Sequence, residues 1–504
     1  MSIKMKGIWV QFGCTFILFC RITVTLIQAM TSFSCSWPSK ALRILKSEYS
    51  PLGFKITQST GNVISSIPML GSFTSTLLAG YVSEAIGRKK TMILCGLLNA
   101  VSWSLIVTAR DTLQIILGRF IIGLSSGVGS VTSLVYITEV TQLSIRGSAI
   151  SIASLFYNVG VLTSYLYGWL FSYDVVCYIS LTAAVVFVIL MSCLKETPAY
   201  LIKIGREKEA LNSLKFYRGE SHITDTILEE LLYLKSLETR TSHNCTDVGK
   251  PLTSSEKVKL HNQRVNENTD NKNPWTPLFT IPHNRRAIIT LGTFMVLTVS
   301  MGMGAVQTYA NQFFATAAPA LSPDLCSVLF ALVLVASSIL SMVVTDLVPR
   351  RILMISTCTI ATICLATLGS AMRHRGAPTW LALAAILLYC VVFQLGVNNI
   401  VFVQLAESFG PQVNSAAAAT ILCLMYATNF TVLLLFAPAV DYIGVDGAFF
   451  VFATIGAITT ALSVLCLKET RRLCLEDVHI MYDKGFFCNT LRSTATDDTC
   501  LSKP

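Results

Sequence analysis

The stretch 118–147, GRFIIGLSSGVGSVTSLVYITEVTQLSIRG, is the part of the sequence that decides the fold. Small residues recur in it at helical spacing: Gly123 is followed by Gly127, and Ser126 by Ser130. This spacing leaves one face of a helix narrow, so that a second helix can approach it closely in lipid. We therefore expect a membrane-spanning helix here that packs tightly against a neighbouring helix.

The charged residues of this stretch stand at its two ends. Arg119 opens it, Glu139 and Arg146 lie toward the other end, and the run between Arg119 and Glu139 carries no charge. Charges are costly in hydrocarbon and are tolerated where a helix meets water or a partner. The ends of this helix are therefore places where an ion pair can form or break.

The whole chain has the composition of a membrane protein. Of its 504 residues, 53% are hydrophobic and 13% are charged, and the mean hydropathy is +0.61, too apolar for a soluble globular protein. Apolar runs recur at about 20 residues, the length that crosses a hydrocarbon core about 30 Å thick. We expect twelve spans: 8–30, 61–83, 91–109, 113–136, 148–171, 174–194, 287–311, 325–347, 352–372, 379–404, 414–437 and 444–467.

The sequence also contains an internal duplication. LKET at 194–197 returns at 467–470, an offset of 273, and Glu139 returns as Glu407, an offset of 268. A third feature, Glu84 followed by Arg88, returns as Asp346 followed by Arg350, an offset of 262. Nearly constant offsets predict an all-α membrane protein of 12 transmembrane helices in two parallel six-helix repeats, with a solute site between the halves near the midplane.

This duplication suggests four segments. They are a six-helix half at 1–194, a segment of amphipathic helices and flexible linker at 195–285, a second six-helix half at 286–467, and a polar tail at 468–504. Lys and Arg are more frequent in the loops on the side that also holds both ends of the chain. The positive-inside rule therefore predicts that both termini are cytoplasmic.

Several classes of protein and site are excluded. The 16 cysteines are scattered in apolar runs without metal-ligand spacing, and no nucleophile–base constellation or phosphate loop is present. The net charge of +10 lies in short loops and one polar segment, which suits anionic lipid better than nucleic acid. We expect no enzyme, cofactor, metal or nucleic-acid partner, and the oligomeric state stays open.

Several motifs in register resemble the sugar porter family of the major facilitator superfamily. They are GYVSEAIGRKK at 80–90, GR at 118–119, YITEV at 136–140 with RG at 146–147, KETPAYL at 195–201, TDLVPRR at 345–351 and LKETRRLCLEDV at 467–478. The resemblance covers about 8–480 and looks closest to insect-type facilitated trehalose and hexose transporters. It implies the major facilitator fold, the plasma membrane as location, and facilitated movement of a small polar solute by alternating access.

The resemblance also implies a set of gating residues. In the family, charged residues at the cytoplasmic ends of the helices link the two halves and break apart when the carrier opens inward. The corresponding residues here are Glu84, Arg88, Glu139, Arg146, Glu196, Asp346, Arg350, Arg351, Glu407 and Glu469, and Arg119 is a further gating candidate. Individually, solvated ion pairs contribute roughly 0–1 kcal/mol, but a network can bias two conformations of similar energy.

The chain departs from the family where sugar is bound. Aligned on Gly302, the Gln-Gln pair of helix 7 becomes Thr298 and Val299, and a following Asn becomes Gly304. Both PET motifs have lost their prolines, to Lys195 and Lys468. The polar residues that remain as candidates for binding solute are Ser154, Asn158, Gln307, Tyr309, Asn398, Asn399 and Asn429.

Two classes of function follow. The first is a facilitative uniporter, favoured over a proton symporter because no acidic residue lies mid-span in the first helix. The second is a non-transporting relative that acts as a sensor or interaction protein, which the lost helix 7 amides favour because a polyol site needs amide partners. A carrier for a different solute is a further alternative, and an anionic one could be met by Arg21 inside the first span.

Overall fold

The computed structural model describes residues 22–141, 146–218, 227, 231–232, 275–317, 321–374, 378–471, 473 and 475–485. These residues are helical almost throughout. The first half contains helix 22–36, α2 (Pro38–Leu45), α3 (Gln58–Ile86), α4 (Arg88–Val107), α5 (Thr112–Val140), α6 (Arg146–Leu170) and α7 (Tyr173–Cys193). Two short helices follow, α8 (Pro198–Lys203) and α9 (Glu207–Arg218). Arg21 and the start of the predicted span 8–30 lie outside the described residues.

The second half repeats this arrangement with more interrupted helices. It contains α12 (Trp275–Thr280), α13 (Pro282–Ser300), α14 (Met303–Thr308), α15 (Ala310–Ala317), α16 (Pro323–Leu347), α17 (Arg350–Arg373), α18 (Thr379–Val392), η2 (Phe393–Val397), α19 (Ile400–Ser408), α20 (Pro411–Cys466) and α21 (Leu475–Asp483). The predicted amphipathic helix that begins GREKEAL is α9, which buries Ala210, Leu214 and Tyr217. The predicted linker, 240–273, lies outside the described residues.

The membrane spans number twelve. In the described part of the chain, nine helices are long and apolar enough to cross a membrane. One of them, Ala416–Cys466, holds two spans that meet at Gly444, where the backbone turns to φ +79°. Helix 22–36 and α6 supply two more. This layout of two repeats of six helices is the predicted fold.

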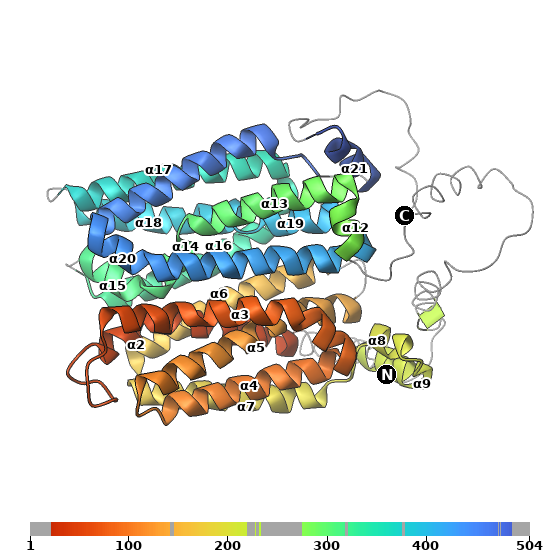
Figure 1. Ribbon diagram of the computed structural model, residues 1–504, viewed down its shortest axis with the longest axis horizontal. Helices are drawn as coiled ribbons and strands as arrows, with labels where there is room; N and C mark the ends of the chain where they lie inside the picture. Colours follow the sequence, from red (N-terminus) through yellow and green to blue (C-terminus); the bar gives the residue numbers. More distant parts are fainter. Residues whose placement is uncertain are drawn as a thin grey trace, which may run out of the picture.

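The two halves lie side by side, and their helices run along the long axis of the molecule (Figure 1). Helices of the first half occupy one side of the picture and helices of the second half the other, and they meet where α3 packs on α20 and α6 packs on α16. One end of the bundle carries α2 and α15, and the opposite end carries α8, α9 and α21. We call these the α2 end and the α9 end.

The small-residue face of α5 packs against α3, as its sequence predicts. A Cβ added at Gly123 would stand 2.2 Å from the carbonyl oxygen of Pro68, and one at Gly127 would stand 2.1 Å from the Ser75 hydroxyl. Neither distance is possible for a real side chain. The two helices therefore approach closely because these positions carry no side chain.

The helix that opens the second half is broken at Gly302. Its backbone has φ +86°, a conformation that costs other residues about 1–2 kcal/mol, and an added Cβ would stand 2.3 Å from the Phe452 ring. The span is thus divided into α13, which starts at the α9 end, and α14 and α15, which continue to the α2 end. Discontinuous helices of this kind expose backbone polar groups near the middle of a carrier.

Candidate functional site

The first set of predicted gating residues forms one cluster, which we call the N-half cluster: Arg88, Glu139, Glu196 and Thr197. Arg88 begins α4 and reaches Glu139 near the end of α5, with Nη2 3.0 Å from Oε1. The Thr197 hydroxyl donates to the other Glu139 oxygen at 2.5 Å. Glu196 accepts the backbone N–H of Lys89 at 3.0 Å and so caps the start of α4.

The same arrangement recurs in the second half as the C-half cluster: Arg350, Glu407, Glu469 and Thr470. Arg350 Nη2 lies 3.0 Å from Glu407 Oε1, and the Thr470 hydroxyl donates to Glu407 Oε2 at 2.5 Å. Glu469 accepts the backbone N–H groups of Arg350 and Arg351 at 3.1 Å each. Equivalent residues of the two repeats therefore make the same ion pair and the same hydrogen bonds in both halves.

The clusters differ from the expectation in one respect. They were expected to link the two halves, but each of these ion pairs, as found in the described residues, joins residues of a single half. The cause is local geometry, because the first residue of α4 or α17 meets the last turn of a helix in its own repeat. In this conformation the clusters fix helices within each half.

The side chains of two other predicted gating residues make contacts outside the two clusters. Glu84 pairs with Lys203 at 3.2 Å on the exposed surface, and Arg351 donates to the Val464 carbonyl at 2.6 Å. The side chains of Arg146 and Asp346 lie outside the described residues. Their place in the gate stays a prediction.

Arg119 does not join either cluster. It lies twenty residues before Glu139 on α5, about 30 Å along the helix, so it lies toward the α2 end. Its side chain is fully buried, donates to the Ser34 carbonyl at 2.7 Å and to the Ile64 carbonyl at 3.2 Å, and lies over the Trp37 ring. Arg119 is therefore a gating candidate at the opposite end of α5 from Glu139, and its role in gating stays a prediction.

Burial shapes the electrostatics of the N-half cluster. Loss of solvent raises the pKa of the Glu196 carboxyl, while the N–H groups of Lys89 and Thr197 and the charge of Arg88 oppose the shift. Glu196 lies between α7 and α8, outside the membrane-spanning helices. Its carboxyl is therefore held in a site where desolvation outweighs its hydrogen bonds.

Several predicted solute-binding residues bridge the halves in the middle of the bundle. The Asn158 amide donates to the Ser338 hydroxyl at 2.9 Å, and the Gln394 amide donates to the Ser154 hydroxyl at 3.4 Å. Asn158 and Ser154 lie on α6, whereas Ser338 and Gln394 belong to the second half. These side chains sit where the halves must separate for a solute to pass.

Asn398 and Asn399, which lie between η2 and α19, have different surroundings. Asn399 donates to the Ser341 hydroxyl at 2.7 Å and to the Gln394 carbonyl at 2.9 Å, a carbonyl at the π-helical turn η2. Asn398 donates only weakly to Asn399, at 3.4 Å. Asn399 therefore supports the irregular turn within its own half, and Asn398 is the better placed of the two to meet a solute.

Gln307 and Tyr309, the candidates in the predicted span 287–311, follow the break at Gly302. The Gln307 carbonyl accepts the Tyr165 hydroxyl at 2.5 Å, and Tyr309 stacks on Phe436 with ring centres 5.4 Å apart. Asn429 on α20 fills the space next to Gly304, since an added Cβ there would stand 2.5 Å from its Oδ1. Asn429, which matches a sugar-contacting asparagine of the resembled family, therefore lies directly beside the broken helix.

A further group of residues was missed by the sequence reasoning. At the α2 end, Lys40 Nζ lies 2.6 Å from Asp324 Oδ2, Arg43 donates to Asn311 Oδ1 at 3.2 Å, and the Asn311 N–H donates to the Ser39 hydroxyl at 2.9 Å. We call these five residues the α2 cluster. It joins α2 of the first half to α15 and α16 of the second, and the only signal in the sequence was the spacing of Lys40 and Arg43 on one helical face.

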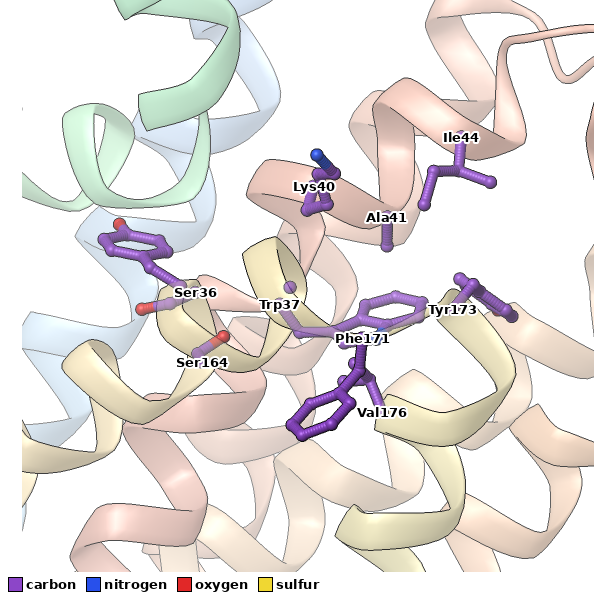
Figure 2. A pocket seen from close by; sticks show the side chains of 11 residues that line it. Ser36, Trp37, Lys40, Ala41, Ile44, Ser164, Phe171, Tyr173 and Val176 are labelled. Atoms are coloured by element: carbon purple, nitrogen blue, oxygen red, sulfur yellow. The ribbon is translucent and has the colours of Figure 1, made fainter. Parts of the chain in front are cut away.

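The cavity beside this cluster is too small to hold a sugar. It lies between α2, α6 and α7, and its walls include Trp37, Lys40, Ser164 and Tyr173 (Figure 2). Its volume is about 20 Å³, which is room for one water molecule. The α2 end is therefore closed in this conformation. The rings of Trp37 and Tyr173 fill the first half there, and the α2 cluster joins the two halves.

No group of three or more His, Cys, Asp or Glu side chains that could hold a metal ion is found in the part of the chain that the structure describes.

Comparison with known proteins agrees with this geometry. The sequence model of the family described as "Sugar (and other) transporter" matches residues 22–482. The facilitated trehalose transporter Tret1 of Culex quinquefasciatus is 25% identical over 472 residues, 92% of this chain and 86% of that protein. Tret1 of Aedes aegypti is 25% identical over 477 residues, 94% of this chain and 55% of that longer protein. The xylose transporter XylE from E. coli, in its inward open conformation, has the same fold, with a TM-score of 0.71, 18% identity, and coverage of 92% of this chain and 99% of that one.

Proposed function

This chain belongs to the family of sugar and other transporters, and we propose that it is a facilitative carrier that moves a sugar or related polar solute by alternating access. The observation that carries the proposal is the difference between the two ends of the bundle. The α2 cluster joins the halves at one end, whereas the two ion-pair clusters at the other end each lie within one half. A carrier that is closed at one end and held together differently at the other is in one state of such a cycle.

We further propose that the α9 end faces the cytoplasm of a cell whose plasma membrane holds the protein. That end carries the basic clusters Arg88-Lys89-Lys90 and Arg350-Arg351, and the positive-inside rule favours such loops inside. The conformation described is then inward-facing. The halves 1–194 and 286–467 would rock about the interface of α3 with α20 and of α6 with α16.

The solute would bind between the halves at the level of the Gly302 break. We propose that Ser154 and Asn158 of the first half and Gln307, Tyr309, Asn398 and Asn429 of the second line this site. Asn158 and Ser154 are bonded across it in this conformation, so a solute hydroxyl can take over their hydrogen bonds at little net cost. Asn399, held by its own half, would support the site.

The alternative of a non-transporting relative is not favoured. It rests on the helix 7 amides that this chain lacks, whereas Asn429, which matches a sugar-contacting asparagine of the resembled family, is retained beside Gly304. Two ion-pair clusters with equivalent atoms also suit a protein whose halves move as units. We therefore keep transport as the function and leave the identity of the sugar to the experiment.

The test is radiolabelled uptake in cells that lack hexose transport, with glucose, fructose, trehalose and several polyols offered singly. We expect saturable uptake of at least one of them, and a loss of roughly tenfold or more in Asn429→Ala, since a buried amide contact contributes about 1–3 kcal/mol. Thr431→Ala, a change at an exposed residue of the same helix, serves as the control. Surface protein that takes up none of these solutes would overturn the proposal.

A further inference from the structure

Two lysines stand at equivalent places in the two repeats, directly before the glutamates of the ion-pair clusters. Lys195 precedes Glu196 and Lys468 precedes Glu469, and in the resembled family both positions hold proline. Proline offers no side-chain donor, whereas lysine offers three on a long stem. Each repeat has therefore gained an ammonium group next to the glutamate that caps a helix in its ion-pair cluster.

Lys468 is a buried cation that binds the end of a helix. It is 1% exposed, and its Nζ donates to the Met481 carbonyl at 2.9 Å and to the Gly485 carbonyl at 2.6 Å, while lying 5.1 Å from the centre of the Tyr482 ring. Met481 lies in the last turn of α21, where carbonyls lack partners within the helix, and Gly485 lies two residues beyond its end. A cation there is favoured both by the hydrogen bonds and by the helix dipole.

A second cation completes this cap from another helix. Arg286 at the start of α13 donates to the Tyr482 carbonyl at 2.9 Å and to the Asp483 carbonyl at 2.6 Å. The ring of His283, also on α13, stacks on His479 of α21 at 4.1 Å between centres. The end of α21 is thus held at once by α13 and by the segment after α20 that carries Glu469.

Lys195 makes the corresponding contacts in the first half, but on the surface. Its Nζ donates to the Asn212 carbonyl at 3.2 Å and lies 5.2 Å from the centre of the Phe216 ring, both on α9. Its side chain is exposed. Each lysine therefore offers its ammonium to a carbonyl and an aromatic ring of the amphipathic helix that follows its repeat.

The backbone carbonyls of the two lysines bind the bundle itself. The Lys195 carbonyl accepts the hydroxyls of Tyr136 on α5, at 2.5 Å, and Tyr217 on α9, at 2.6 Å. The Lys468 carbonyl accepts the Gln404 amide on α19 at 2.8 Å. Tyr136 and Gln404 each lie three residues before the glutamate that forms the ion pair, so each lysine is bound to the same turn as that glutamate.

We propose that Lys195 and Lys468 are a matched pair of positioning residues that hold α9 and α21 to the two ion-pair clusters, so that each helix moves together with its cluster during transport. The pairing rests on the proposed function, in which the clusters move. Burial makes the two unequal: the Lys468 side chain is almost fully removed from water, whereas the Lys195 side chain stays solvated. The C-terminal helix α21 is then the more tightly coupled of the two.

The experiment compares Lys468→Met with Lys195→Met, since methionine keeps the stem and removes the ammonium. The first readout is backbone hydrogen exchange in the whole purified protein. We expect exchange in α21 to rise about tenfold in Lys468→Met, and exchange in α9 to rise about twofold in Lys195→Met, because charged hydrogen bonds count for more when buried. Lys208→Met removes an exposed lysine from α9, Lys484→Met removes one directly after the end of α21, and neither should change exchange in these helices.

The second readout is counterflow of whichever solute the wild type carries. Lys468→Met should lower the maximal exchange rate several-fold with little change in KM, because the solute site is not touched. Unchanged exchange in α21, or an equal effect of Lys484→Met, would overturn the inference. If Lys468→Met does not accumulate, Lys195→Met decides alone by the exposure of α9. A wild type without uptake refutes the proposed function instead, and the hydrogen-exchange readout does not depend on it.

Discussion

The two ends of this protein use polar contacts in opposite ways. At the α2 end, Lys40 and Arg43 of one half bond Asp324 and Asn311 of the other. At the α9 end, the described ion pair Arg88–Glu139 and its repeat Arg350–Glu407 each remain inside one half. Contacts that join halves close a path, and contacts within a half keep that half rigid, so the difference shows which end is closed.

The break at Gly302 lies between the two ends, and removing it should have the largest effect. In Gly302→Ala, the side chain must accept φ +86° and displace the buried Phe452 ring, which we expect to cost about 3 kcal/mol or more. Uptake should fall below detection. The check is the thermal unfolding midpoint in detergent beside uptake, with Gly80→Ala as a control, since no atom lies within 4 Å of a Cβ there. Equal midpoints for the two variants would show that the break can take a side chain.

Weakening the α2 cluster should change which end is open. Asp324→Asn removes the charge that Lys40 meets across the halves, and we expect the population open at the α2 end to grow roughly fivefold, or about 1 kcal/mol. In proteoliposomes of known orientation, the half-saturation concentration for solute on the α2 side should fall. The exchanged pair Lys40→Asp with Asp324→Lys should restore it, and no difference between single and exchanged variants would contradict the role of this pair.

Removing the charge of Glu139 or of Glu407 should slow transport by a similar amount. We expect Glu139→Gln and Glu407→Gln each to reduce exchange about threefold, because Arg88 or Arg350 loses a charged partner while keeping a backbone carbonyl. Adding Arg146→Gln to Glu139→Gln should slow exchange further without removing the protein from the membrane. Counterflow rates normalised to surface protein are the measurement. Unchanged rates in the double variant would remove Glu139 and Arg146 from the gate.

The smallest effect concerns the protonation of Glu196 at the α9 end. Burial raises the pKa of this carboxyl, so the folded protein holds its proton more tightly than the unfolded chain, whose value is about 4.3. The stability gained is complete below that value and is lost as pH rises through the raised pKa. The unfolding midpoint of wild type minus that of Glu196→Gln should therefore decrease from about pH 4 toward neutrality. A difference that stays constant with pH would mean that the carboxyl is not desolvated.

The repeat in the sequence predicted which residues occupy equivalent places in the two halves. Residues that recur at nearly one offset, such as Glu139 with Glu407 and Glu196 with Glu469, do lie in equivalent clusters, because a duplicated chain repeats its local contacts. Lys40 and Asp324 have no such counterpart and lie 284 residues apart, so nothing in the sequence pairs them. The contacts of Arg119 are similar in this respect, because its partners Ser34 and Ile64 lie far from it in the chain.

By itself the sequence determined the fold. The lengths of its apolar runs match the thickness of a membrane, backbone groups in lipid must be bonded within helices, and the repeated motifs divide the spans into two equivalent halves. Only the tertiary structure decided which charges meet, which end is closed, and that Lys195 and Lys468 hold the two amphipathic helices. Those contacts join distant segments, and they depend on packing geometry, which is set to fractions of an ångström by positions such as Gly123, Gly127 and Gly302.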